Sequence, residues 1–166
     1  MIKFEKALES DATKLVEIQK RAFLVDVDVC GEGPLGYNSE NYQIQIMNSH
    51  IYNKILEGDL IIGGFYVRSL CNGLYEIVRL FIDTVYQGKG IGSKALDFIE
   101  NMFDDLKILE LEASGFRKDN HIFYENRGYI KIGEVKYSDN GYSYKYQKII
   151  QKYNEYQKYK MKKYKD

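Results

Sequence analysis

The sequence predicts a single α/β domain in which helices lie on the faces of a mixed sheet. Segments rich in Ile, Phe, Tyr and Val alternate with segments that have the 3.6-residue periodicity of amphipathic helices. The chain has 166 residues, which fits one domain with a sizeable core. Neither a shift in composition nor an internal repeat marks a second domain.

The first part of the chain predicts a short strand followed by two helices. Residues 2–5 read as a strand, and Asp11 is a plausible N-cap for a helix that runs to Phe23. Three glycines and the single proline place a loop at residues 31–36. Ser39 can cap a second helix that reaches about Leu56. Its apolar stripe comprises Ile44, Met47, Ile51 and Ile55.

The remainder predicts strands and two further helices, punctuated by turns. Gly58-Asp59 and Asn72-Gly73 are turn signals, and Asn-Gly is typical of a tight hairpin. A helix follows residues 87–92, and a second short helix ends at Gly128. The predicted strands occupy residues 60–69, 74–83, 107–113, 129–135 and 142–148, and the short helix occupies residues 119–126.

Composition and charge exclude several classes of function. The 24 basic and 24 acidic residues cancel, so no global field favours nucleic acid as a partner. The apolar run at residues 60–65 is too short to cross a membrane, and the first residues lack the apolar core of a signal peptide. Cys30 and Cys71 form no metal-ligand pattern. We therefore expect a cytoplasmic protein with no bound metal and neither a nucleic-acid nor a membrane partner.

The end of the chain differs from the rest. Residues 149–166 are rich in Lys and Tyr and poor in aliphatic residues, which predicts a polar helix or a frayed tail. Basic residues interleaved with tyrosines also leave a nucleic-acid-binding arm open as an alternative. We accordingly divide the chain into a domain at residues 1–148 and this tail.

The glycine-rich turn at residues 87–92 carries the strongest chemical signal. The first N–H groups of a helix have no intrahelical partner, and the helix dipole favours an anion there. Glycines let a bulky oxyanion approach the backbone. A strand, then Gly88, Gly90 and Gly92, then a helix is therefore a candidate phosphate or pyrophosphate site. Lys89 and Lys94 add positive charge nearby.

The spacing of this turn discriminates between phosphate ligands. A Walker A loop needs G-x-x-x-x-G-K-[ST], but Ser93 follows Gly88 at the position of the second glycine. The dinucleotide fingerprint G-x-G-x-x-G fails at the same Ser93, although Glu112 lies about where the ribose-binding acid would be. A nucleotide-binding protein and a turn without a ligand remain the alternatives.

The same turn resembles motif A of the GNAT superfamily of N-acetyltransferases. The pattern Ile82-x4-Gln87-Gly88-Lys89-Gly90-Ile91-Gly92 is similar to its core Q/R-x-x-G-x-G/A. The resemblance implies a mixed, mostly antiparallel sheet flanked by helices, with acetyl-CoA as co-substrate. It implies that the turn amides bind the pyrophosphate of CoA and that a strand N–H near Phe81 or Ile82 polarises the thioester. The cofactor-binding residues expected are Phe81, Ile82, Gln87, Gly88, Lys89, Gly90, Ile91, Gly92, Ser93, Asn120 and Tyr124.

A second segment resembles motif B of the same family. Residues 123–129, Phe-Tyr-Glu-Asn-Arg-Gly-Tyr, are similar to F-Y-E-x-x-G-F/Y. The resemblance implies that Tyr124 donates a proton or hydrogen bond to the departing CoA thiolate. Some members carry an Asn seven residues before this Tyr, but the position here is Arg117. Asn120 or His121 would have to supply that contact instead.

The amine acceptor must lose a proton, and Glu76 is the leading candidate for the base. Strict alternation puts Glu76 on one face with Val78, Leu80 and Ile82, where burial would raise the pKa of its carboxyl. The alternatives are a hydrated carboxylate at an edge position and a carboxylate paired with an arginine such as Arg79. Weaker candidates are Asp26, Asp28 and Glu112, and a relay through water is also open.

The resemblance implies direct transfer of an acetyl group from acetyl-CoA to a primary amine. The alternative is a non-catalytic acyl-CoA-binding module with the same fold. The acceptor would be a small molecule or a peptide, bound by the loop at residues 25–42. Asp26, Asp28 and Glu32 would attract a cationic amine there. Many proteins of this type dimerise, so a homodimer is a further expectation.

Overall fold

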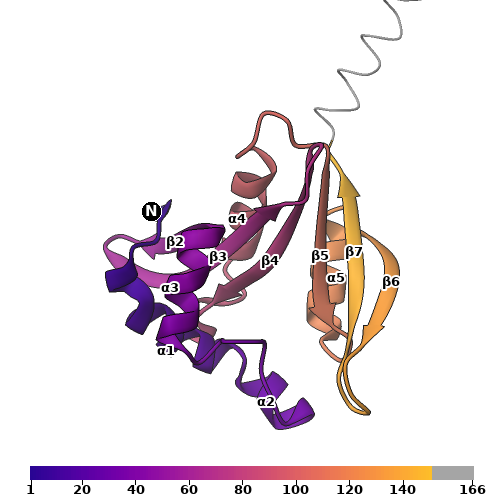
Figure 1. The fold of residues 1–166 in the computed structure, drawn as a ribbon, viewed down its shortest axis with the longest axis horizontal. Coiled ribbons are helices and arrows are strands. Elements are labelled where there is room, and N and C mark those ends of the chain that lie inside the picture. The colour runs from indigo at the N-terminus through magenta and orange to yellow at the C-terminus, as the bar shows by residue number, and fades with distance from the viewer. Residues whose placement is uncertain (151–166) are drawn as a thin grey trace, which may run out of the picture.

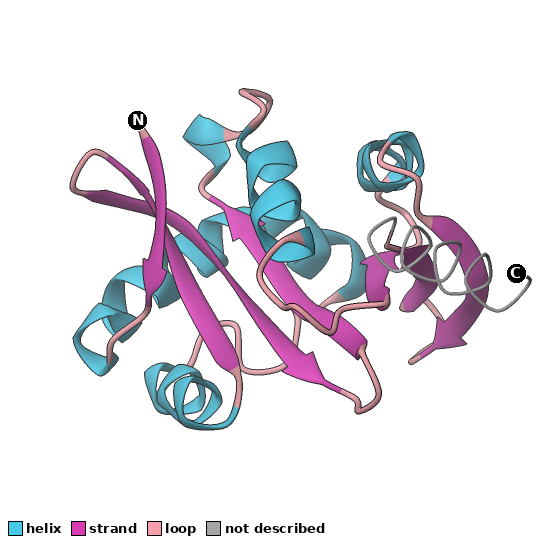
Figure 2. Cartoon of the chain, turned by 90° about the horizontal axis from the view of Figure 1, so that it is seen from above, coloured by secondary structure: helices cyan, strands magenta, loops and turns pink. Residues whose placement is uncertain are grey.

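The computed structural model describes residues 1–150, which form one seven-stranded sheet with helices on both faces (Figures 1 and 2). The tail predicted at residues 149–166 lies, from residue 151 onward, outside the described residues. The elements, in order, are β1 (Ile2–Lys6), α1 (Ala12–Ala22), α2 (Leu24–Cys30), α3 (Glu40–Ser49), β2 (Ile51–Glu57), β3 (Leu60–Ser69), β4 (Leu74–Ile82), α4 (Ile91–Glu100), β5 (Ile108–Ser114), α5 (Lys118–Asn126), β6 (Ile130–Lys136) and β7 (Tyr142–Ile149).

The strand order is β1-β2-β3-β4-β5-β7-β6, and β4 with β5 is the parallel pair of this sheet. The neighbouring pairs β1–β2, β2–β3, β3–β4, β5–β7 and β6–β7 are antiparallel. The predicted mixed, mostly antiparallel sheet is therefore confirmed. No helix of the described residues is both long enough and apolar enough to cross a membrane.

Two apolar cores hold the helices to the sheet. On one face, Leu96 and Ile99 of α4 pack with Leu109 and Leu111 of β5. On the other face, α1 is buried through its apolar stripe, which includes Leu15 and Ile18 and packs with residues of β2, β3 and β4. Each stripe recurs at the spacing that places its residues on one side of a helix. The two faces of β4 therefore look toward different helices.

The helix predicted from Ser39 to about Leu56 is too long. Ser39 does cap α3, because its side chain accepts a hydrogen bond from the N–H of Tyr42 at 3.2 Å. The helix ends at Ser49, and β2 follows at once between β1 and β3. Ile51 and Ile55 thus lie on a strand. Their helical spacing is outweighed by the hydrogen bonds that strands on both sides supply.

The loop predicted between the first two helices contains the additional short helix α2. Its sequence, Leu-Val-Asp-Val-Asp-Val-Cys, alternates in polarity and gives no helical stripe. Leu24, Val25 and Val29 remain exposed, whereas Asp26 is buried. The helix ends where Gly31 adopts a left-handed φ of 82°.

Strands β4 and β5 diverge along their length (Figure 1). Their pairing begins at Leu74 with Ile108 and ends at Ile77 with Leu111, although β4 continues to Ile82. A β-bulge lies at the same point, because Val78 has no partner on β3 between the paired residues on either side. Bulges bend a strand and increase its twist. The later residues of β4 consequently have an edge that β5 does not cover.

Candidate active site

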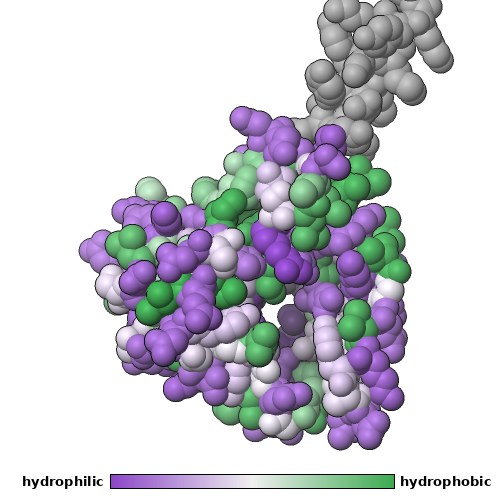
Figure 3. Space-filling model, in the orientation of Figure 1, coloured by the Kyte–Doolittle hydropathy of each residue, from purple (hydrophilic) through white to green (hydrophobic). Residues whose placement is uncertain are grey.

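A cavity of about 550 Å³ fills the space between the diverging strands. Residues 77–80 of β4 form one wall, and residues 111–114 of β5 with α5 form the other. The space-filling view shows a hollow at this place (Figure 3). Cavities of this volume are the usual size of small-molecule sites.

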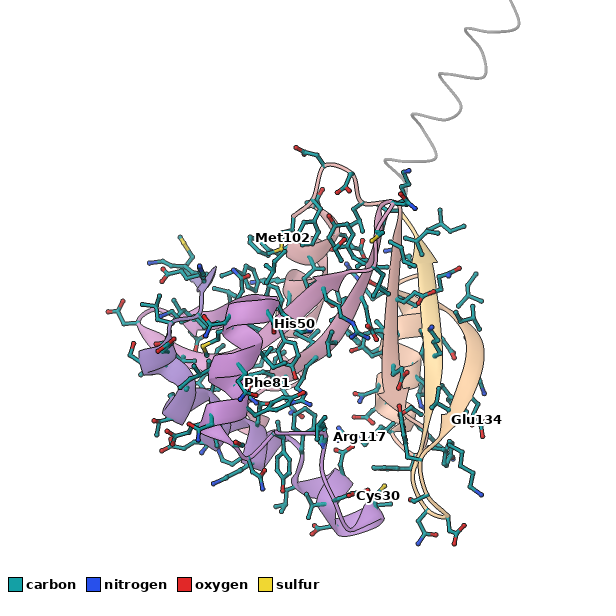
Figure 4. All side chains as sticks on the ribbon, in the orientation of Figure 1. Cys30, His50, Phe81, Met102, Arg117 and Glu134 are labelled. Atoms are coloured by element: carbon teal, nitrogen blue, oxygen red, sulfur yellow. The ribbon has the colours of Figure 1, made fainter. Side chains whose placement is uncertain are left out.

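Helix α2 closes the wide end of the divergence. Buried Asp26 accepts a hydrogen bond from Ser114 Oγ at 2.7 Å and lies 3.6 Å from the guanidinium of Arg117. Cys30 Sγ donates to the carbonyl oxygen of Asn140 at 3.7 Å, in the turn between β6 and β7. Figure 4 labels Cys30 and Arg117, which come from α2 and from the residue before α5. These contacts bridge the two halves of the sheet.

The glycine turn lies just beyond the end of β4. Gly88 and Gly90 have left-handed φ values of 73° and 76°, and a Cβ built at either position meets no atom within 4 Å. Gly90 is the N-cap of α4, and no side chain caps that end of the helix. The turn therefore presents main-chain N–H groups at an open, exposed helix start, as an anion site requires.

Other residues of the turn hold it in place. Gln87 Nε2 donates to the carbonyl oxygen of Ile82 at 2.8 Å, which ties the turn to the last residue of β4. The ammonium of Lys89 lies 5.0 Å from the centre of the Tyr86 ring. Ile91 is buried in the core. Gln87 and Ile91 thus have structural contacts in addition to any role toward a cofactor.

Two expected cofactor-binding positions on α4 lie at the surface of this core. Gly92 and Ser93 are half-buried in the first turn of the helix. A Cβ at Gly92 would approach Phe123 of α5 at 3.2 Å. The start of α4 and helix α5 are therefore in contact.

Tyr124 of α5 lines the cavity, whereas the preceding Phe123 faces α4. The ring of Tyr124 lies edge-on to the ring of Tyr129, with the two centroids 5.7 Å apart. Burial raises the pKa of its hydroxyl to about 12. No described residue makes a hydrogen bond to this hydroxyl, so it is available to a ligand in the cavity.

Glu76 shares a face of β4 with Val78, as predicted, but the prediction that Leu80 and Ile82 lie on the same face is wrong. Tyr75 and Ile77 pack into the core beneath α4, so Glu76 points to the opposite face. The bulge at Val78 then shifts the alternation by one residue, and Leu80 and Ile82 pack on the α4 side instead. Glu76 accepts a hydrogen bond from Arg68 Nε on the neighbouring strand and does not line the cavity. Its partner is therefore Arg68, not Arg79.

The remaining expected residues lie around the cavity and its edge. Phe81 is buried beneath α1, and Ile82 packs against the α4 core, so the two side chains lie on opposite faces of β4 (Figure 4 labels Phe81). Asn120 lines the cavity. His121 instead makes a 2.9 Å hydrogen bond with the carbonyl oxygen of Ser114.

Of the acidic residues considered for the acceptor, Asp26 and Glu32 line the cavity, and Asp28 does not. Glu112 also lines it and accepts a hydrogen bond from Tyr137. The wall also contains two charged residues that the sequence did not assign to it, Arg79 and Arg117. Arg79 was expected only as a partner for Glu76. A charged residue within the apolar run of residues 77–81 was the signal that could have identified it.

The candidate site thus combines a split parallel pair of strands, a glycine turn at a helix start and a tyrosine in the split. A family model described as "Acetyltransferase (GNAT) domain" matches residues 35–149, and the chain belongs to this family. Membership supports acyl transfer from acetyl-CoA at the level of the family. Among curated proteins, no sequence matches the chain.

Solved structures share the fold at low sequence identity. One is described as an acetyltransferase of the GNAT family from Desulfovibrio desulfuricans, with 18% identity, a TM-score of 0.71 and coverage of 90% of this chain and 99% of that one. The ribosomal-protein-S18-alanine N-acetyltransferase of Escherichia coli has 13% identity, a TM-score of 0.74 and coverage of 90% and 94%. The PaiA N-acetyltransferase of Thermoplasma acidophilum, in complex with coenzyme A, has 15% identity, a TM-score of 0.70 and coverage of 87% and 98%.

Proposed function

We propose that this protein is an N-acetyltransferase that moves an acetyl group from acetyl-CoA directly to a primary amine. One arrangement carries the proposal: the uncapped start of α4 lies beyond the open edge of β4, and a cavity lined by Tyr124 lies beside the same strand. Pyrophosphate bound at the turn would place the rest of the coenzyme along this edge. A similar fold is known with bound coenzyme A in the Thermoplasma protein.

In this proposal, main-chain amides of residues 88–93 bind the pyrophosphate of CoA. Gln87 holds the turn against Ile82 and so fixes where those amides point. Lys89 adds positive charge beside the phosphates. Asn120 contacts the coenzyme from the cavity wall.

The reaction begins when the neutral amine attacks the thioester carbon. The carbonyl oxygen becomes an oxyanion, which a main-chain N–H of β4 near Phe81 or Ile82 stabilises. Those residues lie beyond the point where β5 stops pairing with β4. Collapse of the intermediate breaks the C–S bond, and the electron pair leaves with sulfur as the CoA thiolate.

Tyr124 assists departure of the thiolate as a hydrogen-bond donor. A hydroxyl whose pKa is about 12 is a weaker acid than an ordinary thiol, whose pKa is near 8.5. Complete proton transfer from this hydroxyl to the thiolate would therefore be uphill. A hydrogen bond stabilises the thiolate without that cost, and the proton lost by the attacking amine finally neutralises the sulfur.

The proton of the amine passes to water or to Glu112, a carboxylate of the cavity wall. Glu76 takes no part in this scheme, because it is paired with Arg68 and does not line the cavity. Strict alternation along β4 would have grouped Glu76 with Leu80 and Ile82, but the bulge interrupts this alternation.

Release of free CoA tests the proposal. Purified protein with acetyl-CoA and a panel of primary amines should release CoA in an amine-dependent manner. Acetyl-CoA should also raise the melting temperature, whereas NAD and ATP should not. Binding of acetyl-CoA without turnover of any amine would instead favour a non-catalytic acyl-CoA-binding module.

A further inference from the structure

Arg79 is a buried cation of the cavity wall that has no carboxylate partner. Arg79 is 8% exposed and lines the cavity between β4 and β5. Nη1 donates to Gln19 Oε1 at 2.8 Å, and Nη2 donates to the carbonyl oxygen of Leu35 at 2.9 Å. Both acceptors are neutral. Among residues 1–150, no carboxylate forms a salt bridge with this guanidinium.

Two buried polar groups near Arg79 have no hydrogen-bond partner in the described residues. The guanidinium lies 5.3 Å from the centre of the Tyr66 ring, and the buried hydroxyl of Tyr66 has no hydrogen-bond partner in the described residues. Gln19 Nε2 also has no hydrogen-bond partner, although Oε1 of the same side chain accepts a hydrogen bond from Arg79. Buried polar groups are normally satisfied, so the hydrogen bonding around Arg79 is incomplete in these residues.

Burial of an unpaired charge is costly, and arginine cannot escape the cost by losing its proton. Burial lowers the pKa of Arg79, but a guanidinium stays charged at neutral pH. Neutral hydrogen bonds and aromatic faces offset only part of the lost hydration. A structure that keeps such a charge in a cavity wall is suited to an anionic ligand.

The acidic side chains of the cavity wall either have a partner in the protein or are in contact with water. Asp26 has Arg117 and Ser114 as partners, and Glu112 accepts a hydrogen bond from Tyr137. Glu32 is exposed and therefore remains in contact with water. The buried charge of the wall that lacks an opposite partner is thus positive, which argues against a polycation as the acceptor.

We propose that the acceptor of this enzyme is a small amine that carries a carboxylate, as an amino acid does, and that Arg79 binds this carboxylate. The inference rests on the acetyl transfer proposed above. Arg79 and Phe81 are two residues apart on β4, about 7 Å along the strand. Anion binding and acyl transfer therefore occur close enough for one small molecule to reach both. A guanidinium can hold a carboxylate through two parallel hydrogen bonds.

The first experiment compares substrates on the unaltered protein. Common amino acids and their carboxamides serve as acceptors with acetyl-CoA, and polyamines are included. A carboxamide lacks the negative charge and has a more acidic α-ammonium group, so kcat/KM is expressed per concentration of neutral amine. We expect at least one amino acid to exceed its carboxamide by about 10- to 100-fold in kcat/KM, the contribution of hydrogen bonds to a charged group. Equal or faster turnover of carboxamides or polyamines would overturn the inference.

The second experiment assigns the preference to Arg79. In Arg79→Gln, the ratio of kcat/KM between an amino acid and its carboxamide should fall to near one. Arg79→Lys should retain part of it. The matched control is Arg68→Gln, which alters an arginine on the neighbouring strand and should keep the ratio. The ratio is measured within one variant, so it does not depend on the fraction of protein that folds.

The two proposals can fail separately. If acetyl-CoA binds but no amine releases CoA, the proposed transferase activity fails. Thermal stabilisation by amino acids and carboxamides in the presence of CoA then still tests Arg79: a preference for the carboxylate that Arg79→Gln removes would support the inference. Equal stabilisation by both ligands, or a preference that survives in Arg79→Gln, would contradict it.

Discussion

Gly92 lies against the ring of Phe123, so that a Cβ at Gly92 would stand 3.2 Å from Phe123 Cζ. This contact joins the first turn of α4 to α5. The neighbour of Phe123 on α5 is Tyr124, whose side chain lines the cavity. The position of the proposed pyrophosphate site is thereby linked to that of the proposed hydrogen-bond donor.

Gly92→Ala should loosen this link. The added methyl group forces Phe123 to shift by a few tenths of an ångström, which we expect to cost about 1 kcal/mol of stability. Acetyl-CoA should bind several-fold more weakly, as measured by titration calorimetry. Gly133→Ala is the matched control, because a Cβ at Gly133 meets no atom within 4 Å. Unchanged affinity and stability in Gly92→Ala would show that the contact is not restrictive.

Gly90→Glu should abolish acetyl-CoA binding, because the new carboxylate would occupy and repel the pyrophosphate. Gly58→Glu is a close control: both glycines have left-handed φ values, 76° and 62°, and open space at Cβ. Backbone strain of about 1 kcal/mol is therefore common to both variants. Thermal shifts should show loss of stabilisation by acetyl-CoA in Gly90→Glu alone. Normal affinity in that variant would place the phosphate site elsewhere.

Tyr124→Phe should lower turnover by roughly 10- to 1000-fold and change acetyl-CoA affinity little. Since the pKa of Tyr124 is about 12, its hydroxyl stays protonated through the neutral range. The substitution should therefore lower the pH–rate profile without shifting its midpoints. Tyr146→Phe removes a hydroxyl that bonds to Glu125 and should leave turnover within a few-fold. Full activity of Tyr124→Phe would remove this residue from the mechanism.

Asp83→Asn should destabilise the junction between β4 and the glycine turn. Arg21 Nη2 donates to Asp83 at 2.6 Å and lowers the pKa of its carboxyl. Because the Arg21 side chain is 44% exposed, solvent screening limits the loss to about 0.5–1 kcal/mol. Urea unfolding at neutral pH should show this loss, and the exposed Asp59→Asn should not.

The contribution of Asp83 to the free energy of unfolding should decrease as the pH falls. A carboxyl whose pKa is lower in the folded state stabilises the protein above its unfolded pKa of about 3.9 and ceases to do so as pH falls through the folded value. The stability difference between the wild type and Asp83→Asn should therefore narrow as pH is lowered below about 4. A difference that persists or grows in acid would contradict this assignment.

Much of the fold could be predicted where local signals agree. The strand at residues 60–69 has the predicted bounds, and the turn at Asn72-Gly73 has the left-handed conformations that its residues favour. Strand β2 and helix α2 could not be predicted. The first is selected by pairing with β1 and β3, and the second by contacts of Asp26 with distant Ser114 and Arg117.

The candidate site follows from the sequence where it depends on a contiguous motif. The glycine turn and Tyr124 lie in such motifs, and the structure places them near the end of β4 and at the cavity. The separation of Glu76 from Leu80 and Ile82 could not be predicted, because the bulge at Val78 depends on the register of β3 against β4. The role proposed for Arg79 could not be predicted, because it depends on the hydrogen-bond partners of this residue. These partners are Gln19 and Leu35, which are far from Arg79 in the sequence.

A crystal structure of the protein soaked with acetyl-CoA tests the central claim most directly. We predict oxygens of the pyrophosphate within hydrogen-bonding distance of main-chain N–H groups of residues 88–93, and the thioester beside β4 near Tyr124. Coenzyme bound elsewhere, with those N–H groups free of phosphate, would contradict the account.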